Sequence, residues 1–283
     1  MSHVQVDYVT VAALVAAEQI LGRRAEWEAA NERQARFLTD VFVACRDETV
    51  PEIESLASWS ADEISAFLAQ RGFTLHLEPF APSEFGSAAV LDLVGRWARS
   101  CNPTSLRTDD GRKFSAVVTE EDDARFFQAD GHPNPIASLN AESGDTVWMT
   151  MHERPPEMSD LSALTLGLSR GRPTDVFGGL IFPMVDLKTG TFLSWLIGMS
   201  VRDTRDRPCR IAAARQETTL CMNEMGFRAR GAGTILVERG GPHRRRHVIN
   251  RPFLFWVERP GLARPLFVAW LTEEDWRRPP LSI

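Results

Sequence analysis

Cysteine is scarce and widely scattered in this chain. Only four of the 283 residues are cysteine, namely Cys45, Cys101, Cys209 and Cys221, and no two of them form a Cys-x-x-Cys pair. Disulfide scaffolds and zinc sites depend on closely patterned cysteines. We therefore expect reduced, mostly buried thiols, with neither a disulfide framework nor a metal site.

Long apolar runs are also missing from the sequence. None reaches the roughly 20 residues that a membrane-spanning helix needs. A shorter apolar run at residues 9–17 is flanked by the acidic Asp7 and Glu18 and has no basic residue before it, unlike a secretory signal. We therefore expect a cytoplasmic protein without a membrane partner.

The chain has no excess of positive charge. Its formal net charge is −6, whereas nucleic-acid binding calls for a basic surface, so we expect no nucleic-acid partner. Hydrophobic residues make up 43% and charged residues 25%, which is typical of a globular protein with a substantial core. A length of 283 residues suits one large domain of helices and strands.

Common catalytic motifs do not occur either. The sequence has no Gly-x-Ser-x-Gly, no His-Glu-x-x-His and no Gly-x-Gly-x-x-Gly after a strand, so we expect no bound cofactor. Six histidines could supply a general base. The nearest candidate cluster is Asp145, Trp148, His152 and Glu153, although a structural histidine is the simpler interpretation of His152. An enzyme with a site assembled from scattered residues is one alternative.

Helix and strand patterns run through the first two thirds of the chain. Ser60 and Glu63 form a capping-box pattern, which predicts a helix that begins after Ser60 and ends at Gly72. Apolar spacing predicts further helices at residues 9–21, 27–45 and 87–100. Apolar runs and alternation predict strands at residues 114–118, 146–151, 161–168 and 178–183.

The most informative stretch lies between residues 217 and 271. A strand pattern at 217–222 leads into Asn223-Glu224-Met225-Gly226 and then into small residues broken by arginines. Strong strand patterns return at 251–257 and 265–271. The roughly 25 residues between the strand blocks have no helical period, and loops of that length in a compact domain are usually functional or disordered.

This order of features resembles the C-terminal third of a serpin. In that family an Asn-Glu-x-Gly run opens the hinge of the reactive-centre loop, and a Pro-Phe-Leu-Phe strand follows the loop; here that strand begins at Pro252. The resemblance covers residues 180–279. Upstream, Trp97 and Thr104 match two positions of a serpin signature that follows the helix lying across the main sheet.

The resemblance implies an α+β fold, with N-terminal helices packed on a large mixed or antiparallel sheet and a second, C-terminal sheet. We expect a single domain over 1–283. Its parts are a mainly helical part at 1–110, a main-sheet part at 111–226, an exposed loop at 227–251 and a C-terminal β-hairpin at 252–283.

The resemblance also implies a function, the suicide inhibition of a serine or cysteine protease. After cleavage, the hinge of such a loop inserts into the main sheet as a new central strand, which releases stored strain. The implied hinge residues are Glu224, Gly226, Phe227, Ala229, Gly231 and Gly233. The implied bait residues, near the bond that the protease cuts, are Arg239, Gly240 and Gly241.

Strand periodicity divides the hinge into two faces. Phe227, Ala229, Gly231 and Gly233 would point into the core, and the arginines at 228 and 230 would point outward, as insertion requires. Phe227 is the exception, because a ring there would overpack a well-fitted sheet unless the body leaves room.

Phe227 therefore favours an alternative, a non-inhibitory serpin-like protein that binds a partner protein or a small molecule. An apolar cavity left by trimmed parts of the body, lined by some of the eight tryptophans, could hold such a molecule.

Overall fold

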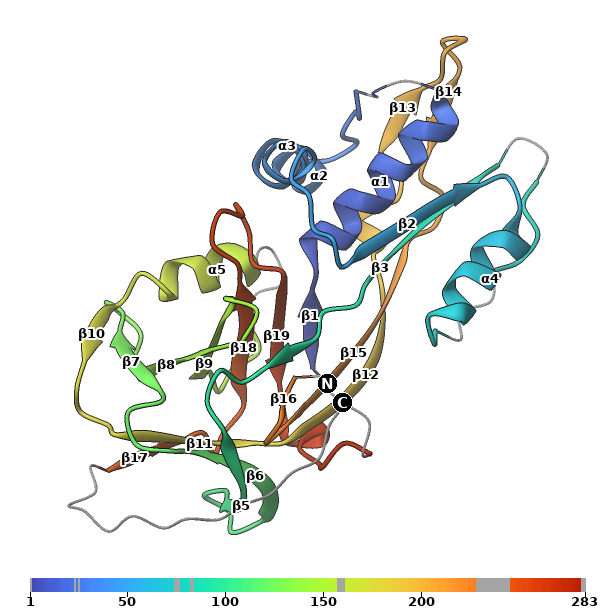
Figure 1. The fold of residues 1–283 in the computed structure, drawn as a ribbon. Coiled ribbons are helices and arrows are strands. Elements are labelled where there is room, and N and C mark those ends of the chain that lie inside the picture. Colours follow the sequence, from blue (N-terminus) through green and yellow to red (C-terminus); the bar gives the residue numbers. More distant parts are fainter. Residues whose placement is uncertain are drawn as a thin grey trace. The chain divides into compact units, whose positions relative to one another are not determined.

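The computed structural model describes residues 2–22, 24, 26–73, 77–81, 84–156, 161–227 and 245–280 (Figure 1). These residues form two compact units. The first contains residues up to 5, 94–188 and those from 218 onward, and the second contains 6–93 and 189–217. Strands β12 (Val185–Phe192) and β15 (Arg215–Asn223) each run from one unit into the other. The single domain inferred from the sequence stays a prediction.

The second unit holds the N-terminal helices. Helix α1 (Asp7–Leu21) confirms the helix predicted at 9–21 and ends at Gly22, whose φ of 74° is the left-handed conformation that glycine adopts easily. Helix α4 (Ala61–Gln70) begins as the capping box predicts, with the Ser60 side chain accepting a hydrogen bond from the Glu63 backbone N–H.

The helix predicted at 27–45 begins later than expected. Asn31 caps its start by accepting a hydrogen bond from the Gln34 backbone N–H at 3.0 Å. The helix then continues without a break, with one π-helical stretch in the middle. Its parts are α2 (Glu32–Arg36), η1 (Phe37–Phe42) and α3 (Val43–Cys45).

The helix predicted at 87–100 is wrong. This segment forms strand β3 (Gly86–Leu91) and the two-residue strand β4 (Gly95–Arg96). Strand β3 pairs antiparallel along its whole length with β2 (Ile53–Ser58), and α1 packs against both strands. Pairing with a distant strand therefore overrides the helical spacing of the apolar residues. The rest of this unit is η2 (Ser194–Leu196) and the hairpin of β13 (Ser200–Arg202) and β14 (Pro208–Arg210).

The first unit is built on a seven-stranded antiparallel sheet. Its strands, in spatial order, are β1 (His3–Gln5), β19 (Phe267–Leu271), β18 (Phe253–Glu258), β9 (Thr146–Met151), β8 (Ile136–Asn140), β7 (Arg125–Gln128) and β10 (Arg172–Thr174). Strands β18 and β19 confirm the strands predicted at 251–257 and 265–271, and they pair antiparallel with Phe255 opposite Ala269. Both strands are almost completely buried, as their unbroken apolar sequence predicts.

Residues 161–168, predicted as a strand, form helix α5 (Leu161–Leu168) instead. A short apolar run does not by itself distinguish a buried strand from a buried helix. Here Leu161 and Leu168 pack with Trp256, Val268 and Trp270, so the helix covers the apolar face of the seven-stranded sheet.

The same unit contains a four-stranded sheet, which includes residues that were predicted to belong to the exposed loop. Its order is β17 (Arg246–Val248), β11 (Gly179–Pro183), β6 (Lys113–Thr119) and β5 (Cys101–Arg107). Strand β17 pairs in parallel with β11, and both His247 and Ile249 are buried. The exposed loop predicted at 227–251 therefore ends before Arg246. Near the C-terminus, the short helix η3 (Glu273–Asp275) follows β19.

Candidate functional site

The candidate site is a tight turn that begins the predicted hinge. Strand β15 ends at Asn223, and the chain reverses through Glu224 and Met225 into β16 (Gly226–Phe227). The Asn223 side-chain oxygen accepts a hydrogen bond from the Met225 backbone N–H at 2.8 Å, which stabilises the turn.

Glycine is the only residue type that fits position 226 without strain. Its φ is 147°, a conformation that residues with a side chain rarely adopt. A Cβ atom there would lie 2.8 Å from the Cα of Arg96 and closer still to the carbonyl oxygen of Gly95. The glycine therefore allows two backbones to approach closely.

Strand β16 lies in the interior of a sheet. The sheet order is β12, β15, β16, β4, and β16 pairs antiparallel with both of its neighbours. Phe227 lies opposite Met222 on one side and opposite Gly95 on the other. The first two residues after the turn thus already form a central strand.

The Phe227 side chain is buried, with 2% of its surface exposed. Its ring lies where a side chain of Gly95 would be, because a Cβ atom on Gly95 would overlap the ring. The rings of Trp97 and Phe255 pack on it, with centroids 5.8 and 6.3 Å away. The glycine removes the overpacking expected at Phe227, and the loop predicted as exposed from residue 227 does not include Phe227.

Two further contacts hold the turn in place. Glu224 forms an ion pair with Arg278 at 2.6 Å, and its side chain is only 16% exposed. The Trp97 indole N–H donates a hydrogen bond to the Asn223 carbonyl at 2.9 Å. The turn is therefore fixed both by the C-terminal segment and by the segment that follows β4.

The other predicted hinge and bait residues lie outside the described residues. These are Ala229, Gly231, Gly233, Arg239, Gly240 and Gly241. Their roles stay predictions from the resemblance.

The catalytic cluster proposed from the sequence is not assembled. Asp145 and His152 lie just before and just after β9, so a whole strand separates them. Asp145 instead pairs with Arg259 at 2.7 Å. Burial opposes the charged form of Asp145, but hydrogen bonds from Arg259 and Ser143 outweigh it and lower the pKa of the carboxyl.

His152 lies beside another histidine rather than beside a carboxylate partner. The rings of His132 and His152 are 6.1 Å apart, and His132 is hydrogen-bonded to the Thr150 hydroxyl at 2.8 Å. Burial lowers the pKa of both imidazoles. Within the described ranges, no group of three or more His, Cys, Asp or Glu side chains is placed to hold a metal ion.

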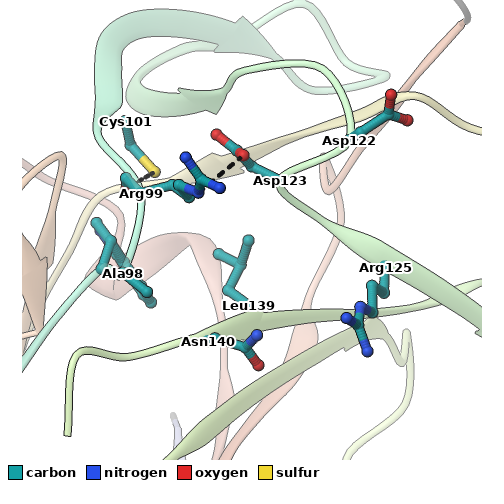
Figure 2. Close-up of a pocket in the computed structure, with 9 residues that line it drawn as sticks. Ala98, Arg99, Cys101, Asp122, Asp123, Arg125, Leu139 and Asn140 are labelled. Carbon is teal, nitrogen blue, oxygen red and sulfur yellow. Dashed lines mark hydrogen bonds and ion pairs between the residues drawn. The ribbon is translucent and has the colours of Figure 1, made fainter. Parts of the chain in front are cut away.

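A cavity of about 210 Å³ lies in the same unit (Figure 2), and Trp97, whose ring packs on Phe227, contributes to its lining. It is lined by residues from the segment after β4, the turn before β7 and the end of β8. They are Trp97, Ala98, Arg99, Cys101, Asp122, Asp123, Arg125, Leu139 and Asn140. The lining is mixed rather than purely apolar, and of the eight tryptophans Trp97 contributes to it.

The acidic side of this cavity is partly neutralised. Arg99 and Asp123 form a loose ion pair at 3.9 Å. Burial raises the pKa of Asp123, which the nearby Arg99 opposes. Burial, together with the Asp123 and Glu120 carboxylates, raises the pKa of the Cys101 thiol to about 12, so this cysteine is a protonated and unreactive thiol at neutral pH.

Sequence reasoning missed Gly95 and Arg125. An isolated glycine among apolar residues indicates a close approach of another group, and this signal was available for Gly95. Arg125 carries no such signal, because its position at the cavity depends on the pairing of β7 with β8.

Comparison with solved structures identifies the fold. The chain is similar to Serpin48 of the insect Tenebrio molitor, with a TM-score of 0.60 and 11% identity over 95% of this chain and 91% of that one. It is similar to human thyroxine-binding globulin in complex with thyroxine, with a TM-score of 0.58 and 12% identity over 95% and 91%. It is also similar to the native state of the thermophilic serpin tengpin, with a TM-score of 0.59 and 10% identity over 96% and 88%.

The two comparisons based on sequence find no match. No family model matches the chain, and no curated protein sequence matches it. Across the described residues, no helix combines the length and apolarity needed to cross a membrane. With three serpin structures matched over nearly the whole chain, the protein has a serpin-like α+β fold.

Proposed function

We propose that this protein is a serpin-like suicide inhibitor of a serine or cysteine protease, acting through the loop that follows Phe227. The observation that supports this most is the placement of β16 between β15 and β4. In the proposed mechanism this two-residue strand is the start of the strand that lengthens when a protease cuts the loop. Each added residue would form hydrogen bonds along β15, and this gain drives the insertion.

The register of β16 fits such an extension. Phe227 lies opposite Met222, so in the same register Ala229 would lie opposite Leu220 and Gly231 opposite Thr218. Met222, Leu220 and Thr218 all belong to the buried face of β15. The small residues would thus enter the core.

The arginines would take the opposite face. Continued in the same register, Arg228 would lie opposite Cys221 and Arg230 opposite Thr219. Thr219 is exposed and Cys221 is only partly buried. Neither arginine would then be buried without a partner, which would be very costly.

The bait bond belongs to the same proposal. The spacing of the resemblance gives Gly240-Gly241, and Arg239 beside it would favour a trypsin-like protease, whose specificity pocket takes a basic residue. Arg245 and Arg246 are exposed but lie against or within β17. We therefore assign Arg246 to strand β17 and Arg245 to the residue before it, and not to the bond that the protease cuts.

Limited digestion with trypsin-like and elastase-like proteases tests this function. The cut is located by mass spectrometry, and the melting temperature is measured before and after it. A cut near Arg239, a large rise in melting temperature and an SDS-stable complex with the protease are expected. A cut with neither stabilisation nor complex overturns the proposal.

A second candidate function is non-inhibitory binding of a small molecule. The observation that favours it is the cavity of about 210 Å³ beside Trp97, whose lining residues all belong to one unit. Among the similar structures, thyroxine-binding globulin is bound to thyroxine, so the fold can serve such a role. This function needs no insertion of the loop.

A further inference from the structure

Two histidines lie side by side at one end of the seven-stranded sheet. His152 directly follows strand β9, and His132 belongs to the turn that joins β7 to β8. The centres of their rings are 6.1 Å apart. Both residues are only partly buried, so an ion from the solvent has access to them. Neither of the functions proposed so far uses this pair.

Side-chain hydrogen bonds fasten the turn that carries His132 to strand β9. The Asn134 side-chain N–H donates to the Met151 carbonyl at 2.9 Å, and the Thr150 hydroxyl donates to the Pro135 carbonyl at 2.9 Å. These contacts hold the turn against the end of the strand. The two histidines are therefore brought together by the fold, before any ion arrives.

The backbone of His152 is held on both sides. Its N–H donates to the Pro252 carbonyl at 2.8 Å, and its carbonyl accepts a hydrogen bond from the Trp270 indole N–H at 2.6 Å. The imidazole ring of His152, in contrast, forms no hydrogen bond or ion pair with the part of the chain that the structure describes. The ring can therefore rotate on a fixed backbone.

The Thr150 hydroxyl determines which nitrogen of His132 carries a hydrogen. It gives its own hydrogen to Pro135, so its oxygen accepts a hydrogen bond from His132 Nε2 at 2.8 Å. In a neutral imidazole the other nitrogen, Nδ1, then has a free lone pair. Burial lowers the pKa of both imidazoles, so both rings are neutral at pH 7, which is the form that binds a metal ion.

The separation of the rings is compatible with a shared metal ion. A metal ion lies about 2.0–2.1 Å from an imidazole nitrogen and therefore about 3.2 Å from the ring centre. Two rings on one ion have centres at most about 6.4 Å apart, and about 5.2 Å apart in a tetrahedral site. The observed 6.1 Å lies within this limit. A rotation of His152 that moves its ring by about 1 Å gives the tetrahedral arrangement.

We propose that His132, through Nδ1, and His152 together bind one divalent transition-metal ion such as Zn²⁺. Imidazole is a preferred ligand of Zn²⁺, Ni²⁺ and Cu²⁺. Within the described residues no third His, Cys, Asp or Glu side chain joins the pair, so water would occupy the remaining positions of the ion. The site is thus open, unlike a structural zinc site with four protein ligands. It is independent of loop insertion and of the cavity beside Trp97.

The test is a titration of the whole chain with Zn²⁺, followed by the backbone amide signals of His132 and His152 in two-dimensional NMR. We expect both signals to follow one saturable curve with a midpoint below about 1 mM. Mg²⁺ prefers oxygen ligands, so the same concentrations of Mg²⁺ should leave both signals unchanged. No saturable shift up to about 1 mM Zn²⁺, or an equal response to Mg²⁺, overturns the proposal.

Matched histidine variants locate the site. We expect His132→Gln and His152→Gln each to weaken Zn²⁺ binding at least about tenfold, because even the outer partners of a metal ligand contribute about 10- to 100-fold. His3→Gln is the control, since His3 lies in β1 of the same sheet with its ring against Trp270. If His3→Gln weakens binding as much as His132→Gln does, the ion binds elsewhere and the proposed site is wrong. Unchanged melting temperatures show that each variant is folded.

Thr150 is the positioning residue of this site, and its variants test the choice of Nδ1. Thr150→Val keeps the shape of the side chain but removes the hydrogen bond to His132, so we expect Zn²⁺ binding to weaken about tenfold. Thr150→Ser keeps the hydroxyl and should bind Zn²⁺ like the unmodified chain. If Thr150→Val binds Zn²⁺ as tightly as Thr150→Ser, the hydroxyl does not orient His132 and binding through Nδ1 is wrong.

Discussion

The ring of Phe227 occupies the space that any side chain at position 95 would need. A Cβ atom built on Gly95 would overlap the ring, and the two residues lie directly opposite each other in β16 and β4. The two positions are more than a hundred residues apart in sequence, yet the Phe227 ring fits only because residue 95 has no side chain. This pair determines how the predicted hinge enters the sheet.

The first prediction is that Gly95→Ala destabilises the protein. The added methyl must displace either the Phe227 ring or the β4 backbone, and such overpacking costs about 1–3 kcal/mol. Urea unfolding followed by tryptophan fluorescence measures the loss. We expect the midpoint to fall with little change in the slope of the transition.

Gly167→Ala is the control for this prediction. Gly167 lies in helix α5, and a Cβ atom there would meet nothing within 4 Å. In a helix, alanine is more stable than glycine by about 0.5–1 kcal/mol, so this variant should be slightly stabilised. Equal changes in the unfolding midpoint of the two variants would show that the contact between Gly95 and the Phe227 ring has no special role.

The sequence predicts the strand that leads into the hinge, because the alternation of a strand is a short-range property. The place of the hinge after Asn223 follows from the family resemblance, and the short strand β16 was not predicted. Gly95 and Arg278, which hold the turn, are brought to it only by the folded chain. An isolated glycine can indicate a close approach at position 95, but no local pattern of one sequence identifies the residue that approaches it.

The errors in secondary structure have the same cause. Residues 87–100 have helical apolar spacing, yet β3 pairs with β2, a strand formed by a segment more than thirty residues earlier. Residues 161–168 are apolar enough for a buried strand, but they cover the sheet as helix α5. In both segments the tertiary partner decides between two patterns that the sequence allows.

The second prediction separates the two faces of the hinge. Ala229→Arg should abolish both the stabilisation after loop cleavage and the SDS-stable complex with the protease, because insertion would bury an unpaired charge. Cleavage itself should continue, so the protein becomes a substrate. Arg230→Glu, on the outward face, should keep the rise in melting temperature.

This comparison has a clear negative outcome. If Ala229→Arg gains as much stability on cleavage as the unmodified chain, then residue 229 does not enter the core. The extension of β16 in its present register would then be wrong, whatever happens in Arg230→Glu.

The third prediction concerns the pair of Asp145 and Arg259. Asp145 is 1% exposed and accepts hydrogen bonds from Arg259 at 2.7 and 3.0 Å. Asp145→Ala removes the carboxylate that pairs with Arg259, and removing one partner of a buried ion pair costs about 3–5 kcal/mol. Since the Arg259 side chain is 22% exposed and keeps some contact with water, we expect the lower end, about 3 kcal/mol, in urea unfolding.

The matched control is Asp130→Ala. Asp130 pairs with Arg172 at 3.4 Å, but both side chains are almost fully exposed. Exposed ion pairs contribute little to stability. A loss in Asp130→Ala as large as that in Asp145→Ala would contradict the assignment of the Asp145 effect to burial.

The fourth prediction is a loss of stability in acid that originates at His247. This residue lies in the edge strand β17, and its ring is packed between Phe126 and Phe177 at centroid distances of 6.1 and 5.0 Å. Its Nε2 atom is buried without a hydrogen-bond partner. Burial, assisted by the charge of Arg245, lowers the pKa of the imidazole to about 4.

The pKa of His247 in the folded chain lies below the ordinary value of 6.5. Between pH 6.5 and about 4, the imidazole therefore binds a proton in the unfolded chain but not in the folded chain. The free energy of unfolding should therefore be unaffected by His247 above pH 6.5 and fall by up to about 3 kcal/mol as the pH drops to about 4. His247→Phe keeps an aromatic ring between Phe126 and Phe177 and removes the titrating group. Urea unfolding from pH 7 to pH 4 should show a shallower loss in this variant than in the unmodified chain. Since the other histidines titrate in both proteins, equal losses would mean that His247 is already protonated in the folded state or that β17 separates before it titrates.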